Sequence, residues 1–495
     1  MPAVRGPHDV VAYPGYSYPN THPDRLAVMG MLHGLTPASV ERCRVLEVAC
    51  GDGANLVPMA YAISAGEFVG FDLAHVPVER GQQRVRELGL DNVRLFQSDL
   101  LDVGTDLGEF DYIIAHGFYS WVPEHVADRL FALCHQLLAP NGIAFISYNA
   151  LPGSYLRLML RDMMLFRAQG IEDPEERVAA GMDCLRFLVA ARPEGDPHRA
   201  LIEEQLKRMG SHSAAATYHD ELCADYRPVH FIDFVRRAEK HGLQYLGEPV
   251  LPPPPDPGYR SDLRAALEGA YPGDLLQQEQ MLDFLRMRSY GETLLCKAGL
   301  PVRRDFAVER FSELLLASQA ASQPGETPGS TAFVLPGGIR MESNHPAVVR
   351  LLDELHHAWP RALSFSEIAP RLADAGFSLE GAGAALLIRL AVSKMVELRT
   401  WRAPVAEEIS DRPRASAYSR YESHRATIAT TLLHTTIRLE DPKVRSLLQL
   451  LDGSRNRADL IEAMAREFPG TPAAEIEQGL EPNLQMLYTA GVLEA

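Results

Sequence analysis

The segment from Val45 to Asn55 joins a short apolar run to a turn of small residues, a pattern suited to ligand binding. Small residues in this turn stand at every second position: Ala49, Gly51 and Gly53. At a strand-to-helix turn, small residues let backbone N–H groups come close to a ligand. The spacing is not the GxGxxG of dinucleotide-binding turns, and Glu47 and Asp52 would crowd a diphosphate. An acidic rim of this kind favours a cationic ligand, such as a sulfonium amino acid with its ammonium group.

Two further acidic positions follow predicted strands. Asp72 comes 21 residues after Gly51, where a carboxylate can accept hydrogen bonds from both ribose hydroxyls. Ser98 and Asp99 end the next predicted strand, where they could receive an adenine amino group. A single acid after a strand more often caps a helix. Three acids at successive strand ends, beside a glycine turn, together favour a nucleoside ligand.

These residues depend on an alternation of strand-like and helix-like segments. Helical stretches at 78–88 and 124–138 separate short apolar runs, which predict strands at 44–50, 67–73, 93–99, 110–116 and 143–149. This alternation predicts an α/β fold with a parallel, doubly wound sheet. We expect two later strands, at 242–246 and 290–298, to complete the same sheet, with residues 152–222 forming a helical cap between.

The composition excludes several classes of protein. The chain has 495 residues and a formal charge of −17, which argues against a protein that coats nucleic acid by neutralising phosphates. Its six cysteines form no CxxC pair, so we expect neither a disulfide scaffold nor a zinc cluster, and a reducing cytoplasm is the simplest compartment. No run approaches about 18 uncharged apolar residues, so we expect no membrane span and no membrane partner.

The last third of the chain has a different organisation. Residues 301–332 are predicted to be a helix and a flexible linker, because 317–332 is rich in Ser, Gln, Pro, Gly and Thr. A weak repeat follows, in which the pattern of Pro346, Val348 and Leu351 recurs at Pro442, Val444 and Leu447. It predicts two winged-helix-like α+β modules, at 333–404 and 405–495.

The whole pattern resembles the class I S-adenosylmethionine (SAM)-dependent methyltransferases, in particular the subfamily that carries a "methyltransferase regulatory domain". Besides the glycine turn, the resemblance rests on five segments: 17–26 (SYPNTHPDRL), 115–123 (AHGFYSWVP), 147–149 (SYN) followed by Pro152-Gly153, 228–234 (PVHFIDF) and 283–286 (DFLR). That subfamily includes rickettsial protein lysine methyltransferases. The resemblance implies a Rossmann-like seven-stranded sheet within a SAM-binding core at 1–300, in which 223–300 is a regulatory region that completes the sheet.

The resemblance also assigns roles to residues on both sides of the site. The residues implied to contact SAM are Tyr18, in an N-terminal segment that would fold over the cofactor, together with Glu47, Ala49, Cys50, Gly51, Asn55, Asp72, Leu73, Ser98, Asp99, Leu100, His116 and Gly117. Candidates for the acceptor side and catalysis are His116, Tyr119, Trp121, Tyr148 and Asn149. Aromatic faces can hold a sulfonium or methylammonium, and a histidine can accept a proton. A sulfonium methyl is already activated, so neither a nucleophilic triad nor a metal is expected.

We therefore expect a SAM-dependent methyltransferase acting on a protein or peptide, with lysine N-methylation the choice that the resemblance favours. The C-terminal modules support a large acceptor, because a small-molecule enzyme needs no such platform. Two alternatives stay open: O-, S- or C-methylation of a peptide natural product or small molecule, and a non-catalytic SAM-binding regulator. Residues 441–495 carry five Lys or Arg against nine Asp or Glu, which speaks against a DNA partner for that module. The oligomeric state is left open.

Overall fold

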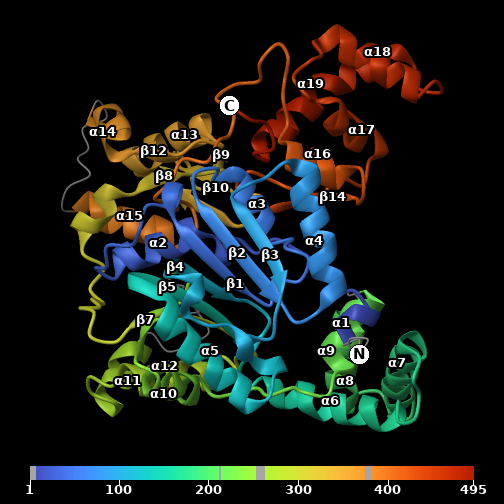
Figure 1. Ribbon diagram of the computed structural model, residues 1–495. Helices are drawn as coiled ribbons and strands as arrows, with labels where there is room; N and C mark the ends of the chain where they lie inside the picture. Colours follow the sequence, from blue (N-terminus) through green and yellow to red (C-terminus); the bar gives the residue numbers. More distant parts are fainter. Residues whose placement is uncertain (1–6, 211–212, 252–261, 374–381) are drawn as a thin grey trace.

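A seven-stranded sheet forms the centre of the molecule (Figure 1). The computed structural model describes residues 7–210, 213–251, 262–373 and 382–495. The strand order is β3-β2-β1-β4-β5-β7-β6, with β7 antiparallel to both of its neighbours. The strands are β1 Arg44–Val48, β2 Glu67–Asp72, β3 Val93–Gln97, β4 Phe110–Ala115, β5 Leu138–Asn149, β6 Leu243–Gly247 and β7 Tyr290–Lys297. The prediction of a seven-stranded class I sheet that late strands complete is confirmed.

Helices cover both faces of this sheet, which explains why four of the five β1 residues are buried. One face packs against α2 and α3, and the other packs against α5 and α10. The helices of this part are α1 Pro7–Val10, α2 Pro23–Leu32, α3 Leu56–Ala62, α4 His75–Leu88, α5 Glu124–Leu137, α10 Phe231–Lys240, α11 Leu263–Ala270 and α12 Leu275–Leu285.

Four helices between β5 and α10 form a helical insert, drawn in green in Figure 1. They are α6 Ser154–Arg167, α7 Pro174–Ala190, α8 Pro197–Gly210 and α9 Ala214–Leu222. A small apolar core of their own holds them together, with Leu160, Met164 and Leu185 fully buried in it. Figure 1 shows the N-terminal helix α1 beside α9, and the ring of His8 stacks on that of His219 at 4.1 Å.

The segment predicted to be a flexible linker is instead structured, so that prediction was wrong. It contributes β8 Leu315–Ala317, β9 Ala321–Pro324 and β10 Thr331–Val334, and pairs with three later strands: β11 Arg340–Ser343, β12 Leu363–Ser364 and β13 Glu397–Arg399. Phe333 and Ala332 are completely buried. Apolar side chains of β8, β12 and β13 belong to the same hydrophobic core as those of α2 and α3. This sheet is therefore packed onto the methyltransferase part of the chain and is not joined to it by a flexible linker.

The remaining helices build the C-terminal third. Those nearest the central sheet are α13 Pro346–Ala358, α14 Phe365–Ala373 and α15 Ala382–Val392. The last part of the chain has a separate apolar core and contains α16 Ala417–Ser423, α17 Pro442–Leu450, α18 Arg457–Glu467 and α19 Ala473–Thr489. It also carries a hairpin of two short strands, β14 Ile428–Thr430 and β15 Thr436–Arg438. We refer to this hairpin with its turn, residues 428–438, as the wing.

Candidate functional site

A cavity of about 540 Å³ opens at the carboxyl ends of β1, β2, β3 and β4. This is where parallel α/β sheets bind ligands. The structure brings all the predicted cofactor-binding residues into its lining: Tyr18, Glu47, Ala49, Cys50, Gly51, Asn55, Asp72, Leu73, Ser98, Asp99, Leu100, His116 and Gly117. We call it the donor cavity.

The turn after β1 is built from left-handed backbone at alternate positions. Ala49, Gly51 and Gly53 have φ values of 57°, 55° and 72°. A Cβ on Gly53 would lie 2.8 Å from Leu95, so this position has no room for a side chain. A Cβ on Gly51, by contrast, would meet no atom of the described residues within 4 Å, because this glycine faces the cavity. Ala49 adopts the left-handed conformation at a cost of roughly 1 kcal/mol.

Carboxylates at the ends of β2 and β3 hold the neighbouring loops. The Asp72 carboxylate accepts hydrogen bonds from the N–H of Gly51 at 2.9 Å and of Ala74 at 2.8 Å. Asp99 accepts one from the N–H of Leu101 at 2.9 Å. Each carboxylate oxygen has a second lone pair, so both acids can still accept hydrogen bonds from a ligand. The two acids thus hold the loops that shape the cavity and also offer oxygen atoms to a ligand.

Glu47 differs from Asp52, the other acid beside the turn, in having no ion pair among the described residues. Its side chain is buried, and Oε1 accepts a hydrogen bond from Asn55 Nδ2 at 2.7 Å. Oε2 has no hydrogen-bond partner among the described residues. Asp52, the other acid of the turn, is paired with Arg84 at 2.8 Å. Burial raises the pKa of Glu47 to about 8, so this carboxyl group is mostly protonated in the free protein at pH 7, and a cation beside it would favour its charged form.

The N-terminal segment from Tyr13 to His22 lies over this cavity, and we call it the lid. The ring of Tyr18 stacks on that of His116 at 3.7 Å. The Tyr18 N–H donates to Asn55 Oδ1 at 2.9 Å. Because Asn55 is the N-cap residue of α3, this bond attaches the lid to the start of that helix. Tyr13 and Tyr16 also line the cavity. The lid therefore supplies an aromatic wall opposite the acids.

Two side chains of β7, Tyr290 and Glu292, lie beside the cavity and contact His116 and the lid. The antiparallel register pairs Tyr290 with Asn149 and Glu292 with Ser147. The Tyr290 hydroxyl lies 3.1 Å from His116 Nε2. Glu292 Oε2 accepts a hydrogen bond from Asn20 of the lid at 2.8 Å. Burial lowers the pKa of His116 to about 4, so the imidazole is neutral at pH 7. Neutral His116 is a poor base for an amine.

Three of the predicted catalytic residues lie elsewhere, and for these the structure corrects the prediction. Tyr119 is buried against Phe131 and Phe234, and Tyr148 stacks on Phe234 at 4.2 Å. Both tyrosines belong to the core between the sheet and α10. Asn149 is also buried, and its side chain accepts a hydrogen bond from Arg157 at 3.3 Å rather than facing the cavity.

The two other predicted residues of the acceptor side, His116 and Trp121, do line the donor cavity. The Trp121 ring packs at 5.0 Å from Tyr226, and the guanidinium of Arg157 lies 5.3 Å from its centroid. Sequence reasoning missed Tyr290, Glu292 and, from the wing, His434. For Tyr290 and Glu292 a signal existed, because both stand at the start of a strand that was predicted to join the same sheet, and one end of such a strand must lie at the edge where the site is. His434 had no such signal.

Metal-ligand clusters and membrane spans are both absent from the described part of the chain. No group of three His, Cys, Asp or Glu side chains there could hold a metal ion. None of the described helices is both long and apolar enough to cross a membrane.

Family models match three separate parts of the chain. Residues 45–142 match a methyltransferase domain, and residues 214–297 match a predicted methyltransferase regulatory domain. Residues 411–471 match the C-terminal winged helix domain of PKMT proteins. The first match covers the turn and acids of the donor cavity. The second covers α9, α10, β6 and β7, and the third contains the wing.

Curated relatives and solved structures agree with these matches. The uncharacterized protein RP028 of Rickettsia prowazekii is 31% identical over 240 residues, which cover 96% of that protein and 48% of this chain. RP789 of the same organism is 33% identical over 309 residues, 61% of this chain, and the match spans only 55% of that relative's length.

The structure of PKMT2 from Rickettsia typhi in complex with AdoHcy is 22% identical, covering 97% of this chain and 99% of that one. Its TM-score of 0.87 shows that the two share a fold through the C-terminal modules. The matches and the donor cavity lead to one conclusion. The chain belongs to the class I, SAM-dependent methyltransferases that combine a methyltransferase domain with a regulatory domain and a PKMT-type C-terminal winged helix.

Proposed function

We propose that this protein transfers a methyl group from SAM to the side-chain amine of lysine in a protein or peptide. The observation that carries the proposal is the donor cavity, in which the unpaired oxygen of Glu47 and the acids Asp72 and Asp99 line one pocket. SAM, when bound, supplies a methyl group on a positively charged sulfur. Glu47 would hold the ammonium group of its amino-acid part, Asp72 its ribose hydroxyls, and Asp99 with Ser98 its adenine amino group.

The acceptor would enter between the lid and β7. There Tyr18 and Tyr290 offer aromatic faces, and Glu292 offers a half-buried carboxylate. Aromatic faces together with carboxylates bind ammonium groups. Since His116 is neutral and its pKa lies far below that of lysine, we propose that it orients groups by hydrogen bonding and stacking and that the proton leaves the amine for solvent. The chain's contribution is then to align the amine and exclude water from it.

The relatives support a protein acceptor. The solved neighbour from Rickettsia typhi is named PKMT2 and contains AdoHcy, and the winged helix model is named for the PKMT proteins. We propose that the lysine acceptor belongs to this chain as well, and that the predicted modules at 333–404 and 405–495 take part in binding it. All six cysteines are free thiols, which supports a cytoplasmic location.

A labelling experiment tests the acceptor. SAM with a radioactive methyl group, the purified protein and a bacterial lysate should give labelled polypeptides whose acid hydrolysates contain N-methyllysine. The matched control is Asp72→Ala at the same concentration, which should leave the polypeptides unlabelled. Label that is released by mild base would show carboxylate methylation, and label confined to small molecules would favour the small-molecule alternative. A protein that binds SAM but labels nothing would be the regulator.

Calorimetry tests the assignment of Glu47. The raised pKa of Glu47 means that this group is protonated in the free protein at pH 6.5, whereas the ligand's α-amino group, with a pKa of about 8, is still an ammonium. Binding S-adenosylhomocysteine (AdoHcy) should therefore release close to one proton, and affinity should rise between about pH 6 and pH 8. Titrations in buffers of different ionisation enthalpy measure this release. Glu47→Gln should bind more weakly and release none, while wild-type binding without proton release would contradict the assignment.

A further inference from the structure

The wing of the C-terminal module reaches the donor cavity's supporting residues. Its turn is closed by hydrogen bonds from Thr431 N to Thr435 O at 2.8 Å and from His434 N to Thr431 O at 3.0 Å. His434 has a left-handed backbone, with φ of 58°, a conformation for which histidine and asparagine are enriched. Its side chain is buried, with 3% of the residue exposed. A polar side chain buried at the tip of a turn needs a partner.

That partner is Asn55, which is 379 residues away in the sequence. His434 Nε2 lies 2.9 Å from Asn55 Oδ1. The Oδ1 atom also accepts the Tyr18 N–H, and Nδ2 donates both to Glu47 and, at 3.0 Å, to Thr21 Oγ1 of the lid. With Asn55 Oδ1 as an acceptor, Nε2 of His434 must carry the ring proton. Burial lowers the pKa of His434 well below its usual value, which agrees with a neutral ring that carries a single N–H.

The side chain of Asn55 does not cap the helix at which it stands. It stands at the N-cap of α3, where an asparagine side chain commonly accepts a hydrogen bond from the helix backbone, yet it makes no such bond. Its amide instead joins the lid, Glu47 and the wing. This arrangement leaves the orientation of the amide, and with it the hydrogen bond to Glu47, dependent on donors that lie outside the methyltransferase domain.

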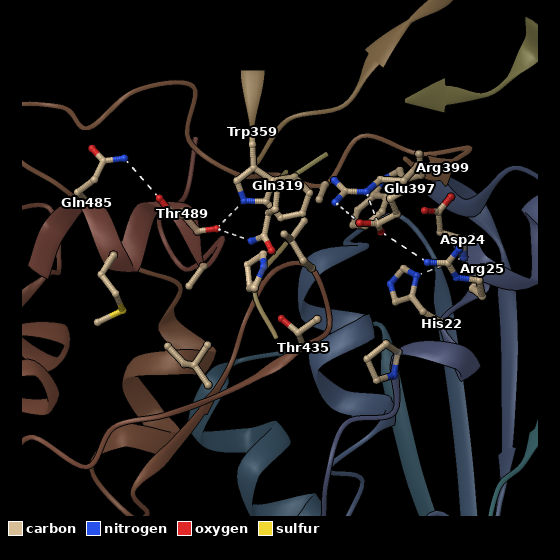
Figure 2. A pocket seen from close by; sticks show the side chains of 18 of the residues that line it. His22, Asp24, Arg25, Gln319, Trp359, Glu397, Arg399, Thr435, Gln485 and Thr489 are labelled. Carbon is tan, nitrogen blue, oxygen red and sulfur yellow. Dashed lines mark hydrogen bonds and ion pairs between the residues drawn. The ribbon is translucent and has the colours of Figure 1, made fainter. Parts of the chain in front are cut away.

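Further contacts hold the lid from the same side. Ser17 Oγ lies 2.8 Å from Thr436 Oγ1 of the wing. Asp24, just after the lid, accepts hydrogen bonds from the N–H and the hydroxyl of Thr400, each at 2.6 Å. Beyond these contacts the lid borders a second cavity, of about 860 Å³, whose lining includes His22 and Asp24 and, across it, Thr489 of the last module (Figure 2). The lid is therefore held there by polar contacts and by the ring of His22, which lies 5.5 Å from that of Trp401 and 5.2 Å from that of His434.

We infer that His434 is a positioning residue for the methyl donor: by holding the Asn55 amide, it sets the Glu47 carboxylate against the amino-acid part of SAM. The inference rests on the proposed function, in which Glu47 receives the ammonium group. The C-terminal module then completes the donor site as well as serving any acceptor. Its effect is local, because Asp72 and Asp99, which would hold ribose and adenine, accept hydrogen bonds from the loops after β1, β2 and β3.

This locality gives a test that a general loss of stability would not reproduce. AdoHcy carries the amino-acid part, whereas 5′-methylthioadenosine has the same nucleoside without it. In the full-length protein, His434→Phe keeps a flat aromatic ring, slightly larger than imidazole, and removes its N–H. It should weaken AdoHcy binding about tenfold, the usual effect of losing one buried hydrogen bond. Binding of 5′-methylthioadenosine should change less than twofold, and both are measured by calorimetry.

Three other variants complete the test. His434→Asn suits the left-handed turn but is too short to reach Asn55, so it should reproduce the effect of His434→Phe and replaces it if that variant does not fold. His434→Gln offers a new N–H and should recover part of the affinity. Arg438→Ala removes a side chain of the same wing that is 82% exposed and should bind both ligands like wild type.

The outcomes separate the two proposals. Equal weakening of both ligands would make His434 an ordinary structural residue, and unchanged AdoHcy binding would show that the wing does not act on the donor site; either result overturns the inference. A wild-type protein that binds neither ligand would instead refute the proposed function itself.

Discussion

Replacing Asp72 with Ala should weaken AdoHcy binding about 100-fold. The variant loses a carboxylate that can accept charge-assisted hydrogen bonds from the ribose, each worth roughly 1.5–3 kcal/mol, and a loss of about 3 kcal/mol corresponds to that factor. It also releases the N–H groups of Gly51 and Ala74, which Asp72 holds at 2.9 and 2.8 Å. Calorimetry on the folded variant measures the change.

Two variants serve as controls for this result. Asp72→Asn keeps an oxygen for one backbone N–H but loses the charge, so its affinity should fall between those of Asp72→Ala and wild type. Asp91→Ala removes an exposed carboxylate just before β3 and should bind like wild type. Unchanged affinity in Asp72→Ala, or tighter binding of NAD than of SAM by the wild type, would remove the basis of the cofactor assignment.

The donor side of the site could be predicted from sequence because its residues are local to strand ends. Glu47, Asp72 and Asp99 each follow or end a strand of the parallel sheet, and strand order brings such ends to one edge. The seven strands could be predicted for a similar reason, since each contains a run of apolar residues that stands out from its neighbours in the sequence. In these places local pattern and tertiary structure agree.

The acceptor side was less predictable, because sequence proximity does not determine which way an aromatic ring points. Tyr119 and Tyr148 stand near the ends of β4 and β5, but Phe234 of α10 packs against both. That helix comes about 85 residues after Tyr148, and its position is fixed only when β6 and β7 add to the sheet. Tyr290 reaches His116 by the same late addition.

Two features of the C-terminal third could not be predicted from the local sequence. Strands β8, β9 and β10 are three or four residues long, which is too short for an alternating pattern to stand out from a polar background. Ala332 and Phe333 are nevertheless completely buried there. The hydrogen bond between His434 and Asn55 joins residues 379 positions apart, and the sequence around neither residue predicts it.

The rate of methyl transfer should rise steeply with pH, by about 100-fold between pH 6.5 and pH 8.5 at saturating SAM. The nucleophile is a neutral amine, and a lysine with a pKa near 10.4 gains about tenfold in its neutral fraction for each pH unit in this range. His116 does not add an inflection there, because burial lowers its pKa to about 4 and it stays neutral throughout. The measurement is kcat/KM for a lysine-containing protein acceptor identified by labelling.

His116→Phe decides between positioning and base catalysis. Phenylalanine keeps the stack under Tyr18 but loses the hydrogen bond with the Tyr290 hydroxyl, so kcat should fall by about tenfold, the effect of one lost hydrogen bond. The slope of log kcat/KM against pH should stay near one. A general base would behave differently: the wild type would show a plateau above the base's pKa, and the plateau would vanish in the variant. That outcome would return His116 to the proton-accepting role that the sequence alone suggested. A preserved slope would instead leave the proton to solvent, with Tyr18, Tyr290 and Glu292 orienting an amine that has already lost it.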